Sequence, residues 1–333
     1  MIVTGLGLAL CFFLGWKFTG NLAGALSFLL IGGILSILEI SLSFDNAIVN
    51  ANKLKTMSPV WQKRFLTWGI LIAVFGMRVV FPLLVVTFAA HINPFAALHL
   101  AISQPDEYAR MIHESHLSIA AFGGTFLMMV ALSYFMNKEK DVHWFRVVEE
   151  YMCKCASIRG LQIGMVLAIV LVFAVCLPDE KASTFLFSAA FGLVTFIAVD
   201  LVGRILDKKS SGIGAAARGG LGAFLYLEVL DASFSFDGVI GAFALTQNLF
   251  LIAIGLGIGA MYVRGMTIML VEKNTLKEFR YLEHGAFYSI LVLAIIMFVQ
   301  ALTPVPEYIT GSLGAGFILV SLMSSMRYKK RQV

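Results

Sequence analysis

Charged side chains are scarce in this sequence: 20 acidic and 25 basic residues make up only 14% of its 333 positions. Soluble domains usually carry about 25% charged residues, so the composition excludes an ordinary soluble protein. Only four cysteines are present. Cys11 and Cys176 lie in apolar runs, and Cys153 and Cys155 lie in a basic loop, so no disulfide framework is expected. Alternating short strands are also lacking, which excludes an outer-membrane barrel.

The sequence contains many long apolar segments. Each has roughly the ~20 residues that a helix needs to cross a bilayer. They predict an all-α, polytopic membrane protein of about nine or ten spans. The first segment precedes Ala23-Gly24-Ala25, which resembles a cleavage site, but it lacks a basic flank, so we expect a retained helix. The segments are residues 2–16, 22–49, 65–90, 118–136, 160–177, 184–206, 221–245, 249–271, 286–303 and 308–326.

Basic residues fall in every second connection. Most of the 25 lie in residues 50–64, 137–159, 207–220 and 272–285 and in the C-terminal tail. Lys and Arg favour cytoplasmic loops, so we expect both termini in the cytoplasm and the chain in the inner (cytoplasmic) membrane. Topology explains the net charge of +5, so that no nucleic-acid partner is implied.

One motif occurs twice. EISLSFDNAIVNA begins at Glu39 and DASFSFDGVIGAF begins at Asp231; in both, an acid is followed six residues later by the aspartate of Ser-Phe-Asp. Four spans separate the copies, so the two motif helices must point in opposite directions. An arginine lies in the span after each copy. The pattern predicts an inverted-topology repeat, common in secondary transporters, within a single domain 1–333. Its halves are about 22–136 and 221–326, joined by spans at about 160–206.

The motifs supply only oxygen ligands. Six residues on a regular helix rotate by ~240°, so we expect both motif helices to be discontinuous, which would let their acids converge on one ion. Oxygen donors suit Mg²⁺, Ca²⁺ or Mn²⁺, and the lack of cysteine and histidine in both motifs disfavours Cu(I) and zinc. The predicted ligands are Glu39, Asp45, Asn46, Asp231 and Asp237, with Ser43 and Ser235 as additional candidates.

Charge balance supports a bound cation. Acids within spans outnumber basic groups, and ionisable residues there cost roughly 2.5–3.5 kcal/mol each. Arg78 and Arg264 are expected to balance part of this charge; the alternative is that they simply form buried ion pairs with the aspartates. Glu228 is either a proton carrier or an acid paired with Arg218. Asp200 is expected to pair with Arg204, four residues later.

The motif residues resemble the TerC-like integral membrane proteins named for tellurium resistance. The likeness rests on Glu39 with Ser43-Phe44-Asp45-Asn46, on Asp231 with Asp237, and on Arg78, Arg264, GGTFLMM at 123–129 and FRYLEHG at 279–285. Phe before each aspartate, Gly238 and the long loop 137–159 depart from the pattern and indicate a divergent branch, of the kind classed as a domain of unknown function. The resemblance implies export of Mn²⁺ or a similar cation, with the motif carboxylates as ligands.

These observations predict a non-enzymatic exporter of a hard divalent cation, manganese favoured and Mg²⁺ or Ca²⁺ as alternatives. Its partners are the bilayer and the transported ion, with no other cofactor; a homo-oligomer and stress-complex partners stay open. One alternative is a non-transporting component of a metal or tellurite resistance complex. Another is an intramembrane aspartyl hydrolase, which needs two acids sharing a proton and typically a Gly-x-Gly-Asp string that this chain lacks.

Overall fold

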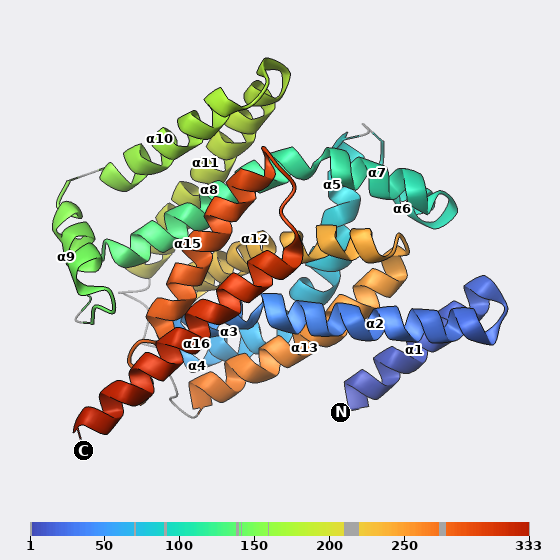
Figure 1. Ribbon diagram of the computed structural model, residues 1–333, viewed down its shortest axis with the longest axis horizontal. Coiled ribbons are helices and arrows are strands. Elements are labelled where there is room, and N and C mark those ends of the chain that lie inside the picture. The colour runs from blue at the N-terminus through green and yellow to red at the C-terminus, as the bar shows by residue number, and fades with distance from the viewer. Residues whose placement is uncertain are drawn as a thin grey trace. The chain divides into compact units, whose positions relative to one another are not determined.

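The computed structural model describes residues 2–69, 71–89, 92–137, 140, 142–158, 160–209, 220–272 and 278–332. These described residues form helices and turns, and none of them lies in a β-strand (Figure 1). The prediction of an all-α protein is therefore confirmed.

The helices, in chain order, are α1 (Ile2–Thr19), α2 (Leu22–Leu42), α3 (Phe44–Leu54), α4 (Pro59–Arg64), the π-helices η1 (Phe65–Gly69) and η2 (Ile72–Val80), α5 (Phe81–Ala89), α6 (Pro94–Ser103), α7 (Pro105–Glu114), α8 (His116–Phe135), α9 (Arg146–Cys155), α10 (Leu161–Cys176), α11 (Asp179–Lys209), α12 (Leu221–Leu245), α13 (Leu249–Glu272), α15 (Leu282–Gln300) and α16 (Glu307–Gln332).

Eight helical segments among the described residues are long and apolar enough to cross a membrane. This finding supports a multi-pass membrane protein. Two of the ten expected spans are not among the eight. One is α10, which is apolar but only 16 residues long. The other is α12, which carries the three acids Glu228, Asp231 and Asp237.

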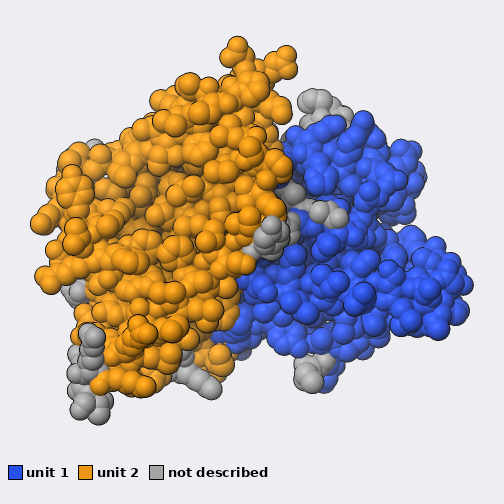
Figure 2. Space-filling view, viewed as in Figure 1, with its two compact units in different colours: residues 1–43, 63–116, 234–266 blue, residues 44–62, 117–233, 267–333 orange. Residues whose placement is uncertain are grey.

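The chain divides into two compact units, coloured in Figure 2. Unit 1 comprises residues 1–43, 63–116 and 234–266, and unit 2 comprises residues 44–62, 117–233 and 267–333. Each unit takes one acid from each motif: Glu39 and Asp237 belong to unit 1, and Asp45 and Asp231 belong to unit 2. The organisation into one domain with two repeat halves stays a prediction.

Unit 1 combines an N-terminal hairpin with a compact apolar core. The hairpin of α1 and α2 turns at Gly20, whose φ of 68° suits glycine, and Asn21 caps α2 by accepting a hydrogen bond from the Gly24 N–H. In the core, Tyr108 of α7 packs on Phe243 of α12 with ring centroids 5.8 Å apart. The core also holds Leu35, Val86, Ala97, Ala101, Ala109, Ile112, Val239, Ala242, Leu249, Ile252 and Leu256.

Unit 2 is built on helix pairs that glycines and aromatic rings bring together. The hairpin of α15 and α16 packs on α3 (Figure 1). At the α8–α15 contact, the ring of Tyr134 stacks on Phe287 at 3.7 Å. Nearby, Gly124 leaves room for Phe298, since a Cβ at Gly124 would lie 2.9 Å from that ring. Short contacts of this kind are typical of membrane helices, which associate through small residues.

The loop between α8 and α10 is fixed by one carboxylate. Glu149 of α9 is fully buried. Its Oε2 accepts a hydrogen bond from Lys140 Nζ at 2.6 Å. Its Oε1 lies 3.2 Å from the Trp144 and Phe145 backbone nitrogens and from the Tyr288 hydroxyl, all of which donate to it. This side chain therefore ties the loop to α15.

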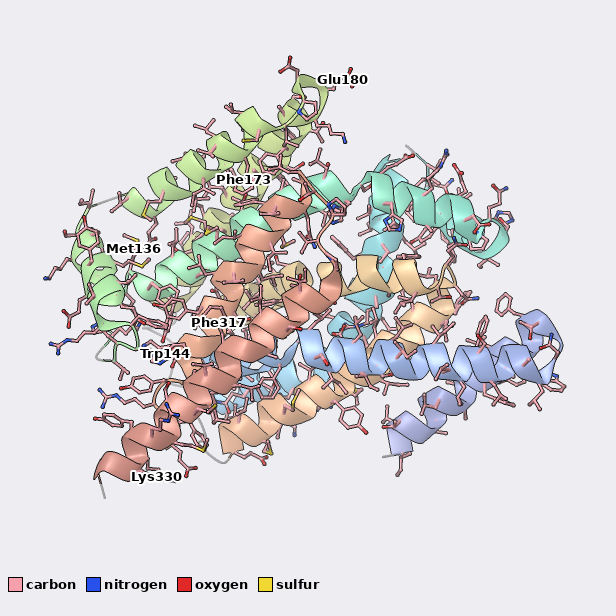
Figure 3. All side chains as sticks on the ribbon, viewed as in Figure 1. Met136, Trp144, Phe173, Glu180, Phe317 and Lys330 are labelled. Carbon is pink, nitrogen blue, oxygen red and sulfur yellow. The ribbon has the colours of Figure 1, made fainter. Side chains whose placement is uncertain are left out.

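Aromatic rings close over the same contact. The rings of Trp144 and Phe317, which are labelled in Figure 3, both contact the ring of Tyr288. Their centroids lie 5.8 and 6.0 Å from the Tyr288 centroid. Since the tyrosine hydroxyl donates to Glu149, the rings help to exclude water from the carboxylate.

Glu149→Gln is expected to loosen this loop. Burial raises the pKa of a carboxyl group, but hydrogen bonds from His284 and Lys140 outweigh burial and hold the pKa of Glu149 at about 2. An unfolded glutamate has a pKa of about 4.3. The stabilisation is therefore complete above about pH 4.3 and is lost as the pH falls toward 2. At neutral pH we expect Glu149→Gln to lower stability by about 2–3 kcal/mol and to accelerate proteolysis within residues 137–159.

The matched control is Glu150→Gln. Glu150 is the next residue on α9, and it pairs with Arg146 while both side chains are exposed. Exposed pairs contribute little, so this variant should be cleaved at the wild-type rate. Equal cleavage of Glu149→Gln and Glu150→Gln would show that the buried carboxylate does not hold the loop.

Candidate metal centre

The first motif helix is interrupted where the sequence predicts it. Helix α2 ends at Leu42, Ser43 is not helical, and α3 begins at Phe44. The Ser43 hydroxyl donates to Glu39 Oε1 at 3.0 Å, and its backbone N–H donates to the Glu39 carbonyl. Glu39 thereby holds the end of its own helix, and the predicted discontinuity of this motif is confirmed.

Glu39 forms a buried ion pair in unit 1. Its partner is Arg78 of η2, and each side chain is only 3% exposed. The π-helical backbone around Arg78 is a conformation that occurs frequently at functional sites. Two glycines make room for the carboxylate: a Cβ at Gly238 would lie 3.3 Å from Glu39 Oε2, and one at Gly259 would lie 2.5 Å from Glu39 Cβ.

Gly259→Ala is expected to destabilise the protein by about 1–3 kcal/mol, because overpacking forces the backbone to shift. The added methyl would also meet the Ser36 carbonyl oxygen at 2.9 Å. Gly265→Ala on the same helix is the control, since nothing lies within 4 Å of its Cβ, and alanine favours a helix over glycine. Thermal unfolding in detergent measures both. A Gly259→Ala protein as stable as Gly265→Ala would contradict the close packing of α13 on Glu39.

The second motif helix is continuous, so the prediction of a second break is wrong. Helix α12 runs without interruption from Leu221 to Leu245. The two acids also differ in their contacts. Asp231 is one methylene shorter than Glu39 and is engaged by Asn50 of α3. Its neighbouring serine, Ser235, is buried and has no hydrogen-bond partner among the described residues, whereas Ser43 bonds to Glu39 at the break.

Asp45 lies in the first turn of α3, in unit 2. Its Oδ1 accepts the Asn46 N–H at 2.8 Å, and its Oδ2 accepts the Ser289 hydroxyl of α15 at 2.7 Å. A carboxylate at a helix N-terminus is stabilised by the unsatisfied N–H groups and the helix dipole. Each oxygen of Asp45 thus already accepts one hydrogen bond within the protein, whereas neither oxygen of Glu228 has a partner among the described residues.

A group of buried oxygen atoms on α3 and α12 has no hydrogen-bond donor among the described residues. Asn50 Nδ2 donates to Asp231 Oδ1 at 2.8 Å and joins the two helices. Around this bond lie buried acceptors with no hydrogen-bond partner in the described part of the chain: Asn46 Oδ1, Asn50 Oδ1 and both carboxylate oxygens of Glu228. Asn46 and Asn50 share a face of α3, and Glu228 and Asp231 share a face of α12, because residues three or four apart are neighbours on a helix.

Three of the five predicted ligands, Asp45, Asn46 and Asp231, therefore lie in unit 2. Glu39 lies in unit 1 and is paired with Arg78. Asp237 also belongs to unit 1, but its side chain lies outside the described residues. No three of the described His, Cys, Asp and Glu side chains converge as a metal site, which leaves the predicted meeting of all four acids a prediction.

The charge-balancing and proton-carrier candidates are placed as follows. Arg264 is half-buried on α13, and its Nε has no hydrogen-bond partner among the described residues. Glu228 is buried. The expected alternative partner of Glu228, Arg218, and the side chain of Arg204, expected to pair with Asp200, lie outside the described residues.

Sequence reasoning missed Asn50 and Ser289. Asn50 carries a usable signal, since it follows Asn46 by four residues and extends the polar stripe of α3. Ser289 carries none, because it is a single serine in an apolar span, and only the packing of α15 on α3 brings it to Asp45.

Comparison with known proteins adds one match. No curated protein and no solved structure matches the chain. A family model described as "Protein of unknown function (DUF475)" matches residues 44–332. The match covers every residue of the α3–α12 group, including Asn46, Asn50, Glu228 and Asp231, while Glu39 precedes it. Because it spans most of the chain, the protein belongs to the DUF475 family.

Proposed function

We propose that this protein transports a hard divalent cation across the membrane through a site on α3 and α12 of unit 2. The ligands are Asn46, Asn50, Glu228 and Asp231. The observation that carries the proposal is the group of four buried acceptor oxygens that find no donor in the described part of the chain.

Electrostatics explains why a cation fits this group. Buried polar atoms are hydrogen-bonded in the large majority of cases, and an acceptor without a donor loses its hydration without compensation. Here the atoms are all acceptors, and two belong to a carboxylate at the depth of a membrane-spanning helix, where charge is expensive. A cation bound among them would compensate for the lost hydration.

The donor types set the class of ion. Amide and carboxylate oxygens favour Mg²⁺, Ca²⁺ and Mn²⁺ over softer metals. Within this class, manganese is proposed because of the resemblance of the motifs to TerC-like proteins. Glu228 remains a candidate to carry a proton when the metal leaves.

The pairing of the motifs supports a transporter. In unit 1, the second motif meets the first at Glu39, beside Gly238. In unit 2, the first motif meets the second at Asp231, through Asn50. The first acid of each motif thus contacts a residue of the other motif that follows the Ser-Phe-Asp sequence: Glu39 contacts Gly238, and Asp231 contacts Asn50. Two copies running in opposite directions give this reciprocal pattern, which inverted-repeat transporters use to build a site at mid-membrane.

We place the protein in the cytoplasmic membrane with both termini in the cytoplasm, because the basic segments alternate along the chain. The direction of transport is export.

The test is the metal content of cells with and without the protein, measured for Mn²⁺, Mg²⁺, Ca²⁺ and Zn²⁺. An exporter of the proposed class lowers cytosolic Mn²⁺, or another hard cation, and leaves Zn²⁺ unchanged. Identical contents of all four metals under metal stress would favour the non-transporting stress-complex component instead.

A further inference from the structure

A polar cavity lies beside the α3–α12 group, within unit 2. Its volume is about 560 Å³, and its lining includes Asn52 and Lys53 of α3 and Tyr226 of α12. These residues lie within one turn of Asn50 and Glu228 respectively. A second cavity, of about 580 Å³, shares Gln162, Phe196 and Asp200 with the first. We call the two together the vestibule.

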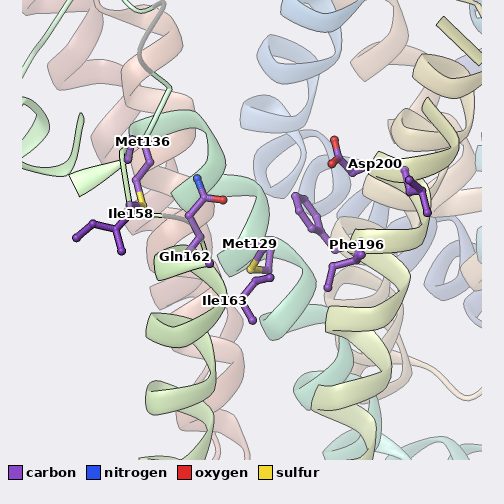
Figure 4. Close-up of a pocket in the computed structure, with 11 residues that line it drawn as sticks. Met129, Met136, Ile158, Gln162, Ile163, Phe196 and Asp200 are labelled. Carbon is purple, nitrogen blue, oxygen red and sulfur yellow. The ribbon is translucent and has the colours of Figure 1, made fainter. Parts of the chain in front are cut away.

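The lining is unusually polar for a bundle of apolar helices. Ser133 comes from α8, Asn137 from the segment that follows it, Gln162 from α10 and Asp200 from α11. In Figure 4, Gln162 and Met129 lie across the second cavity from Phe196 and Asp200. The first cavity has amide and hydroxyl side chains among its apolar lining, and the second is mostly apolar. Lys53 is the one base and Asp200 the one acid among the lining residues, so the vestibule is nearly neutral.

The lining residues come from the same end of every helix. They lie at the ends of α3, α8 and α11 and at the starts of α10, α12 and α15, as the ranges of these helices show. Because successive spans alternate in direction, these ends all belong to one side of the membrane. It is the side that carries the loop with α9 and, by the proposed orientation, the cytoplasm.

Lys53 of α3 lines the first cavity. Its Nζ lies 5.2 Å from the centre of the Tyr226 ring, a cation–π contact.

We propose that the vestibule is the aqueous entrance through which a hydrated divalent cation reaches the α3–α12 group, an inference that rests on the proposed function. Neutral amides and hydroxyls hydrogen-bond the water shell of an ion without stripping it, and Mg²⁺-like ions shed water reluctantly. Dehydration is left to the carboxylates of Glu228 and Asp231.

Cysteine labelling tests the entrance without requiring transport. The four native cysteines are replaced, and Ser133→Cys is introduced in the vestibule. Val194→Cys is the control, because it lies on α11 near Phe196 but its side chain is 60% exposed on the outside of the bundle, facing lipid. Lys154→Cys in the exposed part of α9 marks the loop side. Each variant is treated with a charged, membrane-impermeant thiol reagent, applied separately to the two faces of sealed vesicles.

We expect Ser133→Cys to react about tenfold or more faster than Val194→Cys, since only a hydrated thiol ionises readily, and from the same face as Lys154→Cys. Millimolar Mn²⁺ should slow the reaction at Ser133→Cys, whereas choline should not. Slow labelling, labelling from the opposite face, or no protection by Mn²⁺ would each contradict the proposal that the vestibule is an aqueous entrance for cations. Fast, protected labelling in a protein that moves no metal would uphold it as a cation-holding cavity and reject the proposed transport.

Discussion

Asp231→Asn and Glu228→Gln are each expected to reduce divalent-cation flux by about 100-fold, as loss of a group that holds a metal does. Both changes remove charge and keep the shape of the side chain. Asn50 can still hydrogen-bond an amide at position 231, so the contact of α3 with α12 survives. Flux of Mn²⁺ into liposomes that contain the purified protein and an internal fluorescent indicator measures the effect.

Two controls separate loss of the site from loss of the fold. Glu278→Gln removes an acid from an exposed pair with Lys329 and should leave the flux unchanged. Asp45→Asn should reduce flux less than Asp231→Asn, because Asp45 already uses both oxygens within the protein. If Asp45→Asn proved the most damaging substitution, the site would lie at the start of α3 and the assignment to Glu228 would be wrong.

Arg78→Met is expected to destabilise the protein by about 3–5 kcal/mol, because it leaves the carboxylate of Glu39 buried without its counter-charge. Glu39→Gln should have a comparable effect, since arginine cannot lose its proton. The pair is buried on both sides. The double variant Glu39→Gln with Arg78→Met removes both charges and should recover most of the loss.

A double-mutant cycle, with unfolding followed in mixed micelles, gives the coupling energy directly. A strong favourable coupling is predicted. Additive single effects would mean that Glu39 and Arg78 act independently, and Glu39 would then return to consideration as a metal ligand with its charge unbalanced.

The sequence allowed the membrane helices and the first interruption to be predicted, because both depend on local features. Apolar length predicts spans, and the mediocre helix formers Ser43 and Phe44, with Asn46 just after Asp45, favour an interruption. The continuity of α12 was not predictable from the same motif. Asp231 is held by a residue 181 positions away, and no local periodicity encodes that contact.

The candidate site shows the same limit. The sequence singles out the acids of the two motifs, but the role of each acid depends on the residues that contact it in the fold. Ser289, 244 residues from Asp45, donates a hydrogen bond to that aspartate. Glu228 has no counterpart in the first motif, where Ser36 stands, and only its buried position without a donor among the described residues moves it from a secondary candidate to a ligand.

Direct binding of Mn²⁺ to the purified protein tests the central claim most directly. Free Mn²⁺ gives a sharp paramagnetic resonance signal that is lost on binding, so a titration yields stoichiometry and affinity. We predict one tightly held ion per chain in the wild-type protein and none in the Glu228→Gln, Asp231→Asn double variant. Equal binding by the two proteins, with both correctly folded, would contradict a cation site on α3 and α12.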